Sequence, residues 1–216
     1  MTSIRGGRPL TLLAWSAVWL LVVVVVVFLV IRVTNDIADL TSGHIPPEEE
    51  FDHRYVVNPW PAYLHILPGT IYLLGAPFQL SATIRRRHIR FHRGLGRVLL
   101  VAGAVTGVFA MVIGIIMPFG DLAETSATLV FGLYFLTSLV LAFRAIRSGL
   151  VVVHRRFMIR AFAVGVGVGM IRIVVGIGEA IGIGIEQSFG AAFWIAFTLM
   201  ALLAEVWLRL RPLPPH

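Results

Sequence analysis

Two histidines, His92 and His154, are the residues whose type and spacing best fit ligand chemistry in this sequence. Each stands near the start of an apolar stretch and is followed at once by an arginine, Arg93 or Arg155. We expect both imidazoles at the same depth on the same side, as two histidine ligands on neighbouring helices would need in order to hold a b-type haem iron. The alternative interpretation is that both His-Arg pairs cap helix ends and contact lipid phosphates.

A second set of candidates consists of ionisable residues inside apolar stretches: His65, Arg172 and Glu179. Such residues are rare within a membrane and mark functional sites by default. The three side chains could line an outer polar pocket that holds an anionic or quinone-like head group. Alternatively, they form an internal ion pair that only orients one helix. Arg160 and Glu205 predict a simpler structural ion pair near the opposite membrane face.

No spacing in the sequence predicts a catalytic constellation or a metal site. The chain has no cysteine, which excludes disulfides, thiolate nucleophiles and Cys-ligated zinc. Gly94 and Gly96 form a lone Gly-x-Gly without the rest of a dinucleotide fingerprint. The sequence therefore favours a non-catalytic role over an enzyme.

Six apolar stretches must position these residues, and their solvent must be lipid. The 216-residue chain is 58% hydrophobic and 13% charged, whereas an ordinary soluble domain is about 25% charged. About 20 apolar residues cross a bilayer core as a helix. Segments of that length are 10–31, 62–83, 96–117, 126–146, 157–178 and 189–208. The predicted fold is all-α, a single six-helix transmembrane bundle over residues 1–216.

Arginines and acids alternate between the gaps that separate these stretches, and this alternation predicts the orientation. The loop 34–61 carries six acidic residues, whereas the Arg-rich loop 84–96 carries none. Because basic loops stay in the cytoplasm, we expect 34–61 outside and both termini inside. The residues expected to contact anionic lipid are Arg85, Arg86, Arg87, Arg90 and Arg93. Topology thus accounts for the formal charge of +7 without nucleic acid as a partner.

An offset of 62 residues aligns two parts of the chain and predicts an internal repeat. Tyr72 then matches Tyr134, and His92 matches His154. The second and third stretches would form one helical hairpin, and the fourth and fifth would form its duplicate. Closely spaced glycines predict that the stretch 157–178 is approached by several helices and lies centrally.

Four short segments carry a family resemblance. They are His92–Arg97, with the pattern His-Arg-x-x-Gly-Arg; His154–Arg160, with His-Arg-Arg-x-Met-Ile-Arg; His65–Gly69; and Ala204–Trp207. Together they resemble a bacterial family of uncharacterised multi-pass membrane proteins, defined as a domain of unknown function. The resemblance covers residues 60–208. It implies a helical domain of the bacterial inner membrane and no known activity.

Function has three interpretations at this point. In the first, the protein is a non-catalytic helix-bundle or accessory subunit of a larger membrane assembly, with lipids and other membrane subunits as partners. In the second, it is a small b-type haem or quinone-linked electron-transfer protein that uses His92 and His154, or His65. In the third, it is a small transporter with a site near Arg172. The glycine-rich helices and the short loops favour the first interpretation.

Overall fold

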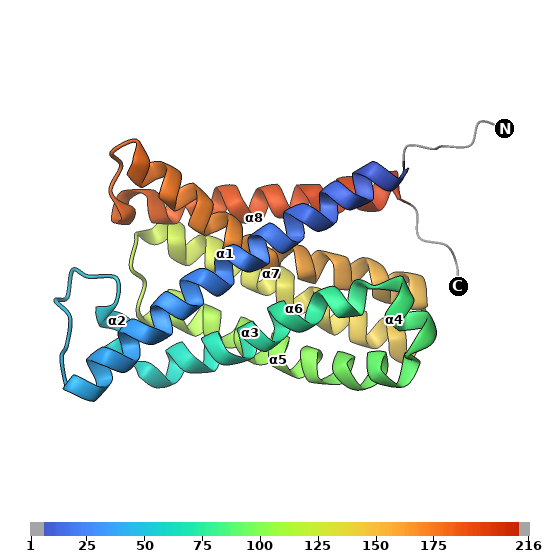
Figure 1. Cartoon of the computed structure of the whole chain (residues 1–216), viewed down its shortest axis with the longest axis horizontal. Coiled ribbons are helices and arrows are strands. Elements are labelled where there is room, and N and C mark those ends of the chain that lie inside the picture. Colours follow the sequence, from blue (N-terminus) through green and yellow to red (C-terminus); the bar gives the residue numbers. More distant parts are fainter. Residues whose placement is uncertain (1–6, 212–216) are drawn as a thin grey trace.

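The chain folds into helices along almost its whole length. A computed structural model describes residues 7–211, and no strand occurs among them. The fold class is therefore all-α, as the sequence predicts. The helices are α1 (Gly7–Ser42), α2 (His53–Val57), α3 (Pro59–Leu80), α4 (Ala82–Arg87), α5 (Ile89–Ile116), α6 (Leu122–Arg147), α7 (Val151–Ala180) and α8 (Ile185–Leu210) (Figure 1).

Five helices of the described region are long and apolar enough to cross a membrane. They are Thr11–Ser42 of α1, α5, α6, α7 and α8. The remaining long helix, α3, has 22 residues and continues through Pro68 and Pro77. Its prolines, together with His65 and Gln79, lower its mean hydropathy below that of the five spans. The several apolar helices agree with the membrane class that the composition predicts.

Local sequence explains where several helices begin and turn. Asp121 precedes α6, and its carboxylate accepts a hydrogen bond from the Ala123 N–H at 2.9 Å, as an N-cap does. Pro59 occupies the first position of α3, where its missing N–H has no helical partner in any case. Gly149 adopts a φ of 73° in the short turn from α6 to α7, a conformation that favours glycine.

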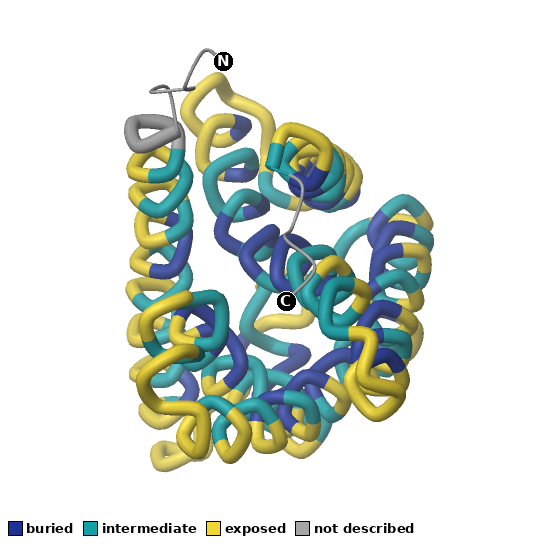
Figure 2. Tube along the Cα trace, turned by 90° about the vertical axis from the view of Figure 1, so that its right-hand side faces the viewer, coloured by how far each residue is buried: buried dark blue, intermediate teal, exposed yellow. Residues whose placement is uncertain are grey.

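Two antiparallel hairpins, α3–α5 and α6–α7, form the body of the bundle. Helix α7 also packs extensively against α8 and contacts α3 and α1, so it is the most central helix. Helix α1 lies outside the hairpins and crosses α7 obliquely (Figure 1). Buried positions face the interior of the bundle, and exposed positions line the outward sides of the helices (Figure 2). Whether the hairpins descend from one duplicated unit stays a prediction.

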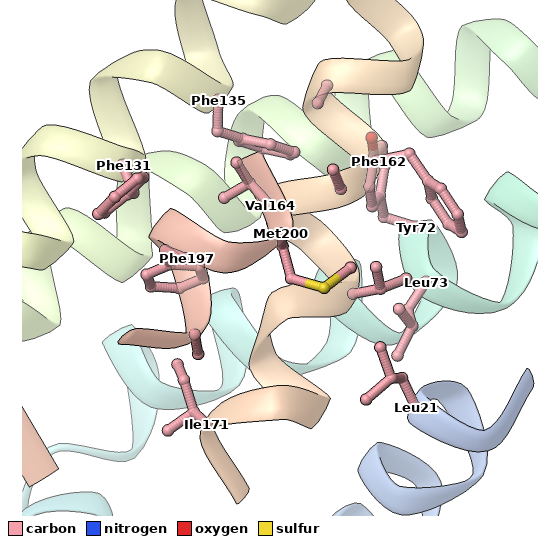
Figure 3. Close-up of a cluster of buried hydrophobic side chains, with 14 of the residues drawn as sticks. Leu21, Tyr72, Leu73, Phe131, Phe135, Phe162, Val164, Ile171, Phe197 and Met200 are labelled. Carbon is pink, nitrogen blue, oxygen red and sulfur yellow. The ribbon is translucent and has the colours of Figure 1, made fainter. Parts of the chain in front are cut away.

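The aromatic ring of Tyr72 marks the centre of the bundle, where four helices meet. Tyr72 of α3 is 2% exposed and packs edge-on against Phe135 of α6, with ring centroids 5.4 Å apart (Figure 3). Cβ atoms built at Gly103 of α5 and Gly165 of α7 would lie 3.0 Å from this ring. Both glycines therefore allow α5 and α7 to approach the ring closely. Such close packing holds the helices together, because lipid offers no hydrophobic drive for their association.

Several helices extend beyond the apolar stretches that predict them. Helix α1 continues to Ser42, α5 begins at Ile89, and most of the Arg-rich segment 84–96 is helical. Arginine is a good helix former, so a transmembrane helix can continue past the hydrocarbon into the polar region. The segment 34–61 likewise contains the end of α1 and the short α2.

Candidate functional site

Charged side chains gather at the end of the bundle where α2 lies, which we call the α2 end. The α2-end cluster consists of Arg32, Asp36, Asp52, Arg54 and Glu124. These residues come from α1, the segment before α2, α2 and α6. Asp36 is 1% exposed and Glu124 is 3% exposed. Charges buried to this degree require partners, and the cluster supplies them.

Arg32 joins α1 to the segment before α2. Its guanidinium forms a salt bridge with Asp52 and another with Asp36, four residues along α1, where Nη2 lies 3.1 Å from Oδ1. The Tyr63 hydroxyl of α3 donates a hydrogen bond to Asp36 Oδ2 at 3.1 Å. Arg32 thus holds two carboxylates, and the Tyr63 hydroxyl ties α3 to one of them, that of Asp36.

Arg54 joins α2 to the turn between α5 and α6. Its Nη1 donates to the Met117 carbonyl at 3.1 Å and lies 3.5 Å from Glu124 Oε1. The backbone N–H groups of Phe119 and Gly120 donate to Glu124 Oε2 at 2.9 and 2.6 Å. Charge-assisted bonds of this kind are stronger than neutral ones. They dock α2 onto the end of the bundle.

Aromatic faces surround the guanidinium groups of the α2 end. The Arg32 guanidinium carbon lies 3.9 Å from the Tyr55 ring centroid, and that of Arg54 lies 4.4 Å from the Phe51 centroid. A desolvated cation over an aromatic ring gains about 0.5–2 kcal/mol. The aromatic rings therefore compensate part of the cost of removing these cations from water.

Arg172 of α7 reaches the same region without a carboxylate partner. Its guanidinium carbon lies 5.4 Å from the Phe28 centroid and 5.6 Å from the Phe51 centroid. No described carboxylate forms a salt bridge with it. Glu179, seven residues further along α7, is exposed. The structure thus places Glu179 on the surface, and the stabilising groups that it places beside Arg172 are aromatic.

His65 of α3 lies within electrostatic range of Arg172 and is engaged by α5. Its Nδ1 lies 3.0 Å from the Thr106 carbonyl oxygen, and the Thr106 hydroxyl donates to the His65 carbonyl at 2.8 Å. Because a carbonyl oxygen only accepts, Nδ1 carries the proton and Nε2 of the neutral ring is left as an acceptor. Of the three residues in the predicted outer pocket, the structure brings two into one neighbourhood.

His92 and His154 lie at the opposite end of the bundle, beside α4, which we call the α4 end. The two imidazoles are within electrostatic range of each other. His154 Nδ1 lies 2.9 Å from the Ala142 carbonyl and donates to it, whereas His92 Nδ1 is buried and has no hydrogen-bond partner among the described residues. The structure therefore places both candidates at the same end of the bundle.

The residues around these two imidazoles are basic. His92 lies within range of Arg85 and Arg93, and His154 lies within range of Arg155. Partial burial lowers the pKa of Arg85, and the charges of Arg155 and Arg86 lower it further. An open surface pocket of about 390 Å³ at this end is lined by Thr83, Arg86 and Arg87. The arrangement is a concentration of positive charge that an anion would relieve.

Arg160 of α7 and Glu205 of α8 form a two-point salt bridge. Arg160 Nε donates to Glu205 Oε1, and Nη2 donates to Oε2 at 3.0 Å. The planar guanidinium matches a carboxylate in this fork geometry. The contact joins the two helices that pack most extensively in the bundle.

The α2-end cluster is the site that the sequence patterns do not identify. Two of its acids, Asp36 and Asp52, belong to the segment 34–61, which the sequence predicts as an outer loop because acidic residues between apolar stretches are usually solvated. Two signals were present in the sequence. Arg32 and Asp36 are four residues apart on one helix, and Arg54 is the sole arginine in the acidic segment 34–61. Both signals are typical of arginines that form salt bridges with nearby carboxylates.

Comparison with known proteins identifies one relationship. Residues 62–208 match a protein family described as Predicted membrane protein (DUF2306). No curated protein and no solved structure matches the chain. The matched region runs from α3 to α8 and includes His65, Arg172 and Glu124. It excludes α1 and α2, so the α2-end cluster joins the family domain to the helices that precede it.

Proposed function

Because the chain belongs to the membrane protein family DUF2306, we propose that it is a six-span protein of the bacterial inner membrane with cytoplasmic termini. We further propose that it acts as a non-catalytic helix-bundle subunit whose α4 end binds anionic lipid head groups. The observation that carries the proposal is the basic neighbourhood of Arg85, Arg86 and Arg155 beside His92 and His154.

The distribution of charge over the two ends supports the orientation. The start of α1 and the end of α8 lie at the same end as α4 (Figure 1), where the arginines of residues 85–97 gather. The acids of 34–61 lie at the other end. Arginine-rich segments are retained in the cytoplasm, so the α4 end faces inward. This orientation requires α3 to cross the membrane as the sixth span.

Labelling of single cysteines tests this topology, because the chain has no cysteine of its own. Glu49 and Arg90 are exposed and flank α3 on either side. We expect a membrane-impermeant maleimide to label Glu49→Cys in intact cells and Arg90→Cys only after permeabilisation. Labelling of both variants from one side would refute the span assigned to α3.

Structural contacts of the polar side chains support a subunit role. His65 is bonded to Thr106, and Arg160 is bonded to Glu205, so these groups hold helices together. In addition, only 11% of the apolar span of α1 is buried. The rest of this span requires cover from lipid or from another membrane subunit. Chemical cross-linking in native membranes, followed by purification on an affinity tag placed after α8, would identify such a subunit.

Anionic lipid binding is tested by comparing two variants with the same substitution chemistry. In detergent, phosphatidylglycerol should raise the melting temperature of the protein more than phosphatidylcholine does. Each basic residue near an anionic surface contributes about 1 kcal/mol, so removing two should weaken the apparent lipid affinity about 30-fold. We expect this loss in Arg85→Gln/Arg155→Gln. The control Arg209→Gln removes one exposed arginine from α8 and should weaken binding less than tenfold.

An equal response of both variants, or no preference of the native protein for the anionic lipid, would refute the proposed lipid contact. High salt should abolish the preference if charge causes it, because screening acts strongly on exposed charges. A preference that survives at 1 M salt would therefore contradict the electrostatic explanation.

A b-type haem is a second candidate, favoured by the geometry of the two histidines. His154 donates from Nδ1 to a backbone carbonyl, which leaves Nε2 for a ligand, as second-shell bonds do at metal sites. His92 lies within electrostatic range of it. The absorption spectrum of the purified protein tests this candidate. A Soret band that sharpens on reduction and is lost in His92→Ala and His154→Ala would support haem, and a colourless protein would exclude it.

A further inference from the structure

Arg172 is the arginine of the α2 end whose donors have no acceptor within the described structure. It forms neither a salt bridge nor a side-chain hydrogen bond there. Phe28 and Phe51 lie near its guanidinium carbon, at 5.4 and 5.6 Å from their ring centroids. Aromatic faces interact with the charge but accept no conventional hydrogen bond. A guanidinium has five N–H donors, so this group requires oxygen acceptors from outside the chain.

The charges of the α2-end cluster itself are balanced when Arg172 is included. Together the cluster and Arg172 hold three arginines, Arg32, Arg54 and Arg172, and three carboxylates, those of Asp36, Asp52 and Glu124. The two carboxylates bound by Arg32 leave one negative charge that offsets Arg172 at longer range. The missing partner of Arg172 must therefore supply acceptor oxygens, and it does not need to carry a net charge.

The depth of Arg172 indicates where those oxygens come from. Helix α7 has 30 residues and is about 45 Å long at 1.5 Å per residue. A hydrocarbon core of about 30 Å leaves about 7 Å of helix beyond it at each end. Arg172 lies eight residues before Ala180, or about 12 Å from that end. It therefore lies about 5 Å inside the boundary, within reach of lipid head groups.

The surroundings of Arg172 are open towards lipid. Phe28 of α1, whose ring lies near the guanidinium, is 45% exposed. A Cβ atom built at Gly176, one turn further along α7, would meet no atom within 4 Å. Helix α1 touches α7 at Leu21 and Gly169 and crosses it obliquely (Figure 1), so the two axes separate towards the α2 end. A lipid can approach the guanidinium along this separation.

We propose that Arg172 binds the phosphate of a phospholipid from the leaflet at the α2 end. The phosphate oxygens accept hydrogen bonds from the guanidinium, the head group lies beside the open face of α7 at Gly176, and the acyl chains pass Phe28 towards the bilayer centre. Guanidinium and phosphate match in a two-point geometry. Because the charge of Arg172 is already compensated within the α2-end cluster, a zwitterionic phospholipid binds as well as an anionic one. This site differs from the proposed α4-end contact, which selects anionic lipid.

Retained phospholipid is the direct measurement. The full chain is purified in detergent, washed to a constant phosphorus content, and extracted with organic solvent for phosphorus and mass analysis. We expect the native protein to retain one more phospholipid than Arg172→Met. Arg172→Lys keeps the charge without the planar fork and should retain an intermediate amount. Arg209→Gln, at the α4 end, should retain as much as the native protein.

Lipid added back to the washed protein gives a second readout that does not depend on Arg172→Met folding. Phosphatidylcholine at 0.5 M salt should raise the melting temperature of the native protein and of Arg85→Gln/Arg155→Gln equally. The α4-end contact should play no part, because it selects anionic lipid and salt screens its charges. Arg172→Lys should lose most of that increase. Equal phosphorus in all variants, or an equal response of Arg172→Lys, would overturn the proposal. So would a quinone in the extract in place of phosphorus.

Discussion

Substitution of Gly169 by alanine should loosen the contact between α1 and α7. A Cβ atom at this position would lie 2.7 Å from the Leu21 carbonyl oxygen and 3.1 Å from Leu21 Cβ. The oxygen belongs to the backbone of α1, so relief requires movement of the helix and not of one side chain. Overpacking of this kind costs about 1–3 kcal/mol.

Gly176→Ala is the matched control, because it makes the same change in the same helix at a position without neighbours within 4 Å. Alanine is about 1 kcal/mol more favourable than glycine inside a helix, and this gain applies to both variants. It cancels when they are compared. We therefore expect Gly169→Ala to be about 1–3 kcal/mol less stable than Gly176→Ala in reversible unfolding in mixed detergent micelles.

Reactivity of a cysteine on α1 reports the detachment directly. Val22 of α1 is buried and neighbours Leu21, and the chain has no native cysteine. In a Val22→Cys background, Gly169→Ala should raise the rate of thiol labelling, whereas Gly176→Ala should leave it unchanged. Equal stabilities together with equal labelling rates would refute the close approach of the two helices.

Three further experiments test other parts of the structure by the free energy of unfolding. Glu124→Gln should cost about 3 kcal/mol, because it leaves a buried arginine without its carboxylate; the exposed control Glu186→Gln should change stability by less than about 0.5 kcal/mol, and similar values for the two would contradict the buried ion pair. Tyr72→Phe should stabilise the protein by about 1 kcal/mol, since the buried hydroxyl has no hydrogen-bond partner among residues 7–211, and a loss of stability would contradict this. A double-mutant cycle of Arg160→Met and Glu205→Gln should give a coupling of about 1 kcal/mol, kept small because the Glu205 side chain is 35% exposed; additive effects would show that the salt bridge contributes nothing.

The fold class and the central place of α7 follow from the sequence because they depend on patterns along single helices. Apolar length predicts α5, α6, α7 and α8, and the spacing of Gly165 and Gly169 predicts close contact on α7. The pairing of Arg160 with Glu205 also has the simple geometry of two antiparallel helices, each with one charge near the same end. These features require no knowledge of how distant loops fold.

The α2-end cluster could not be predicted in the same way, because it depends on the path of a loop. Nothing local in the sequence indicates that Arg54 turns inward to Glu124, 70 residues away. Glu179 shares a helix face with Arg172 by periodicity, yet its side chain is exposed. Periodicity predicts the direction of a side chain and not the presence of a neighbour.

The length of α1 has a consequence for the membrane around the protein. Its 36 residues extend about 54 Å, but its apolar stretch, residues 10–31, extends about 33 Å and matches a hydrocarbon core of about 30 Å. The crossing at Gly169 and the Arg32–Asp52 salt bridge set the inclination of α1 against the bundle. Helix α1 therefore cannot change its tilt freely to suit a bilayer of another thickness. The protein should be most stable in a membrane whose hydrocarbon thickness matches this stretch.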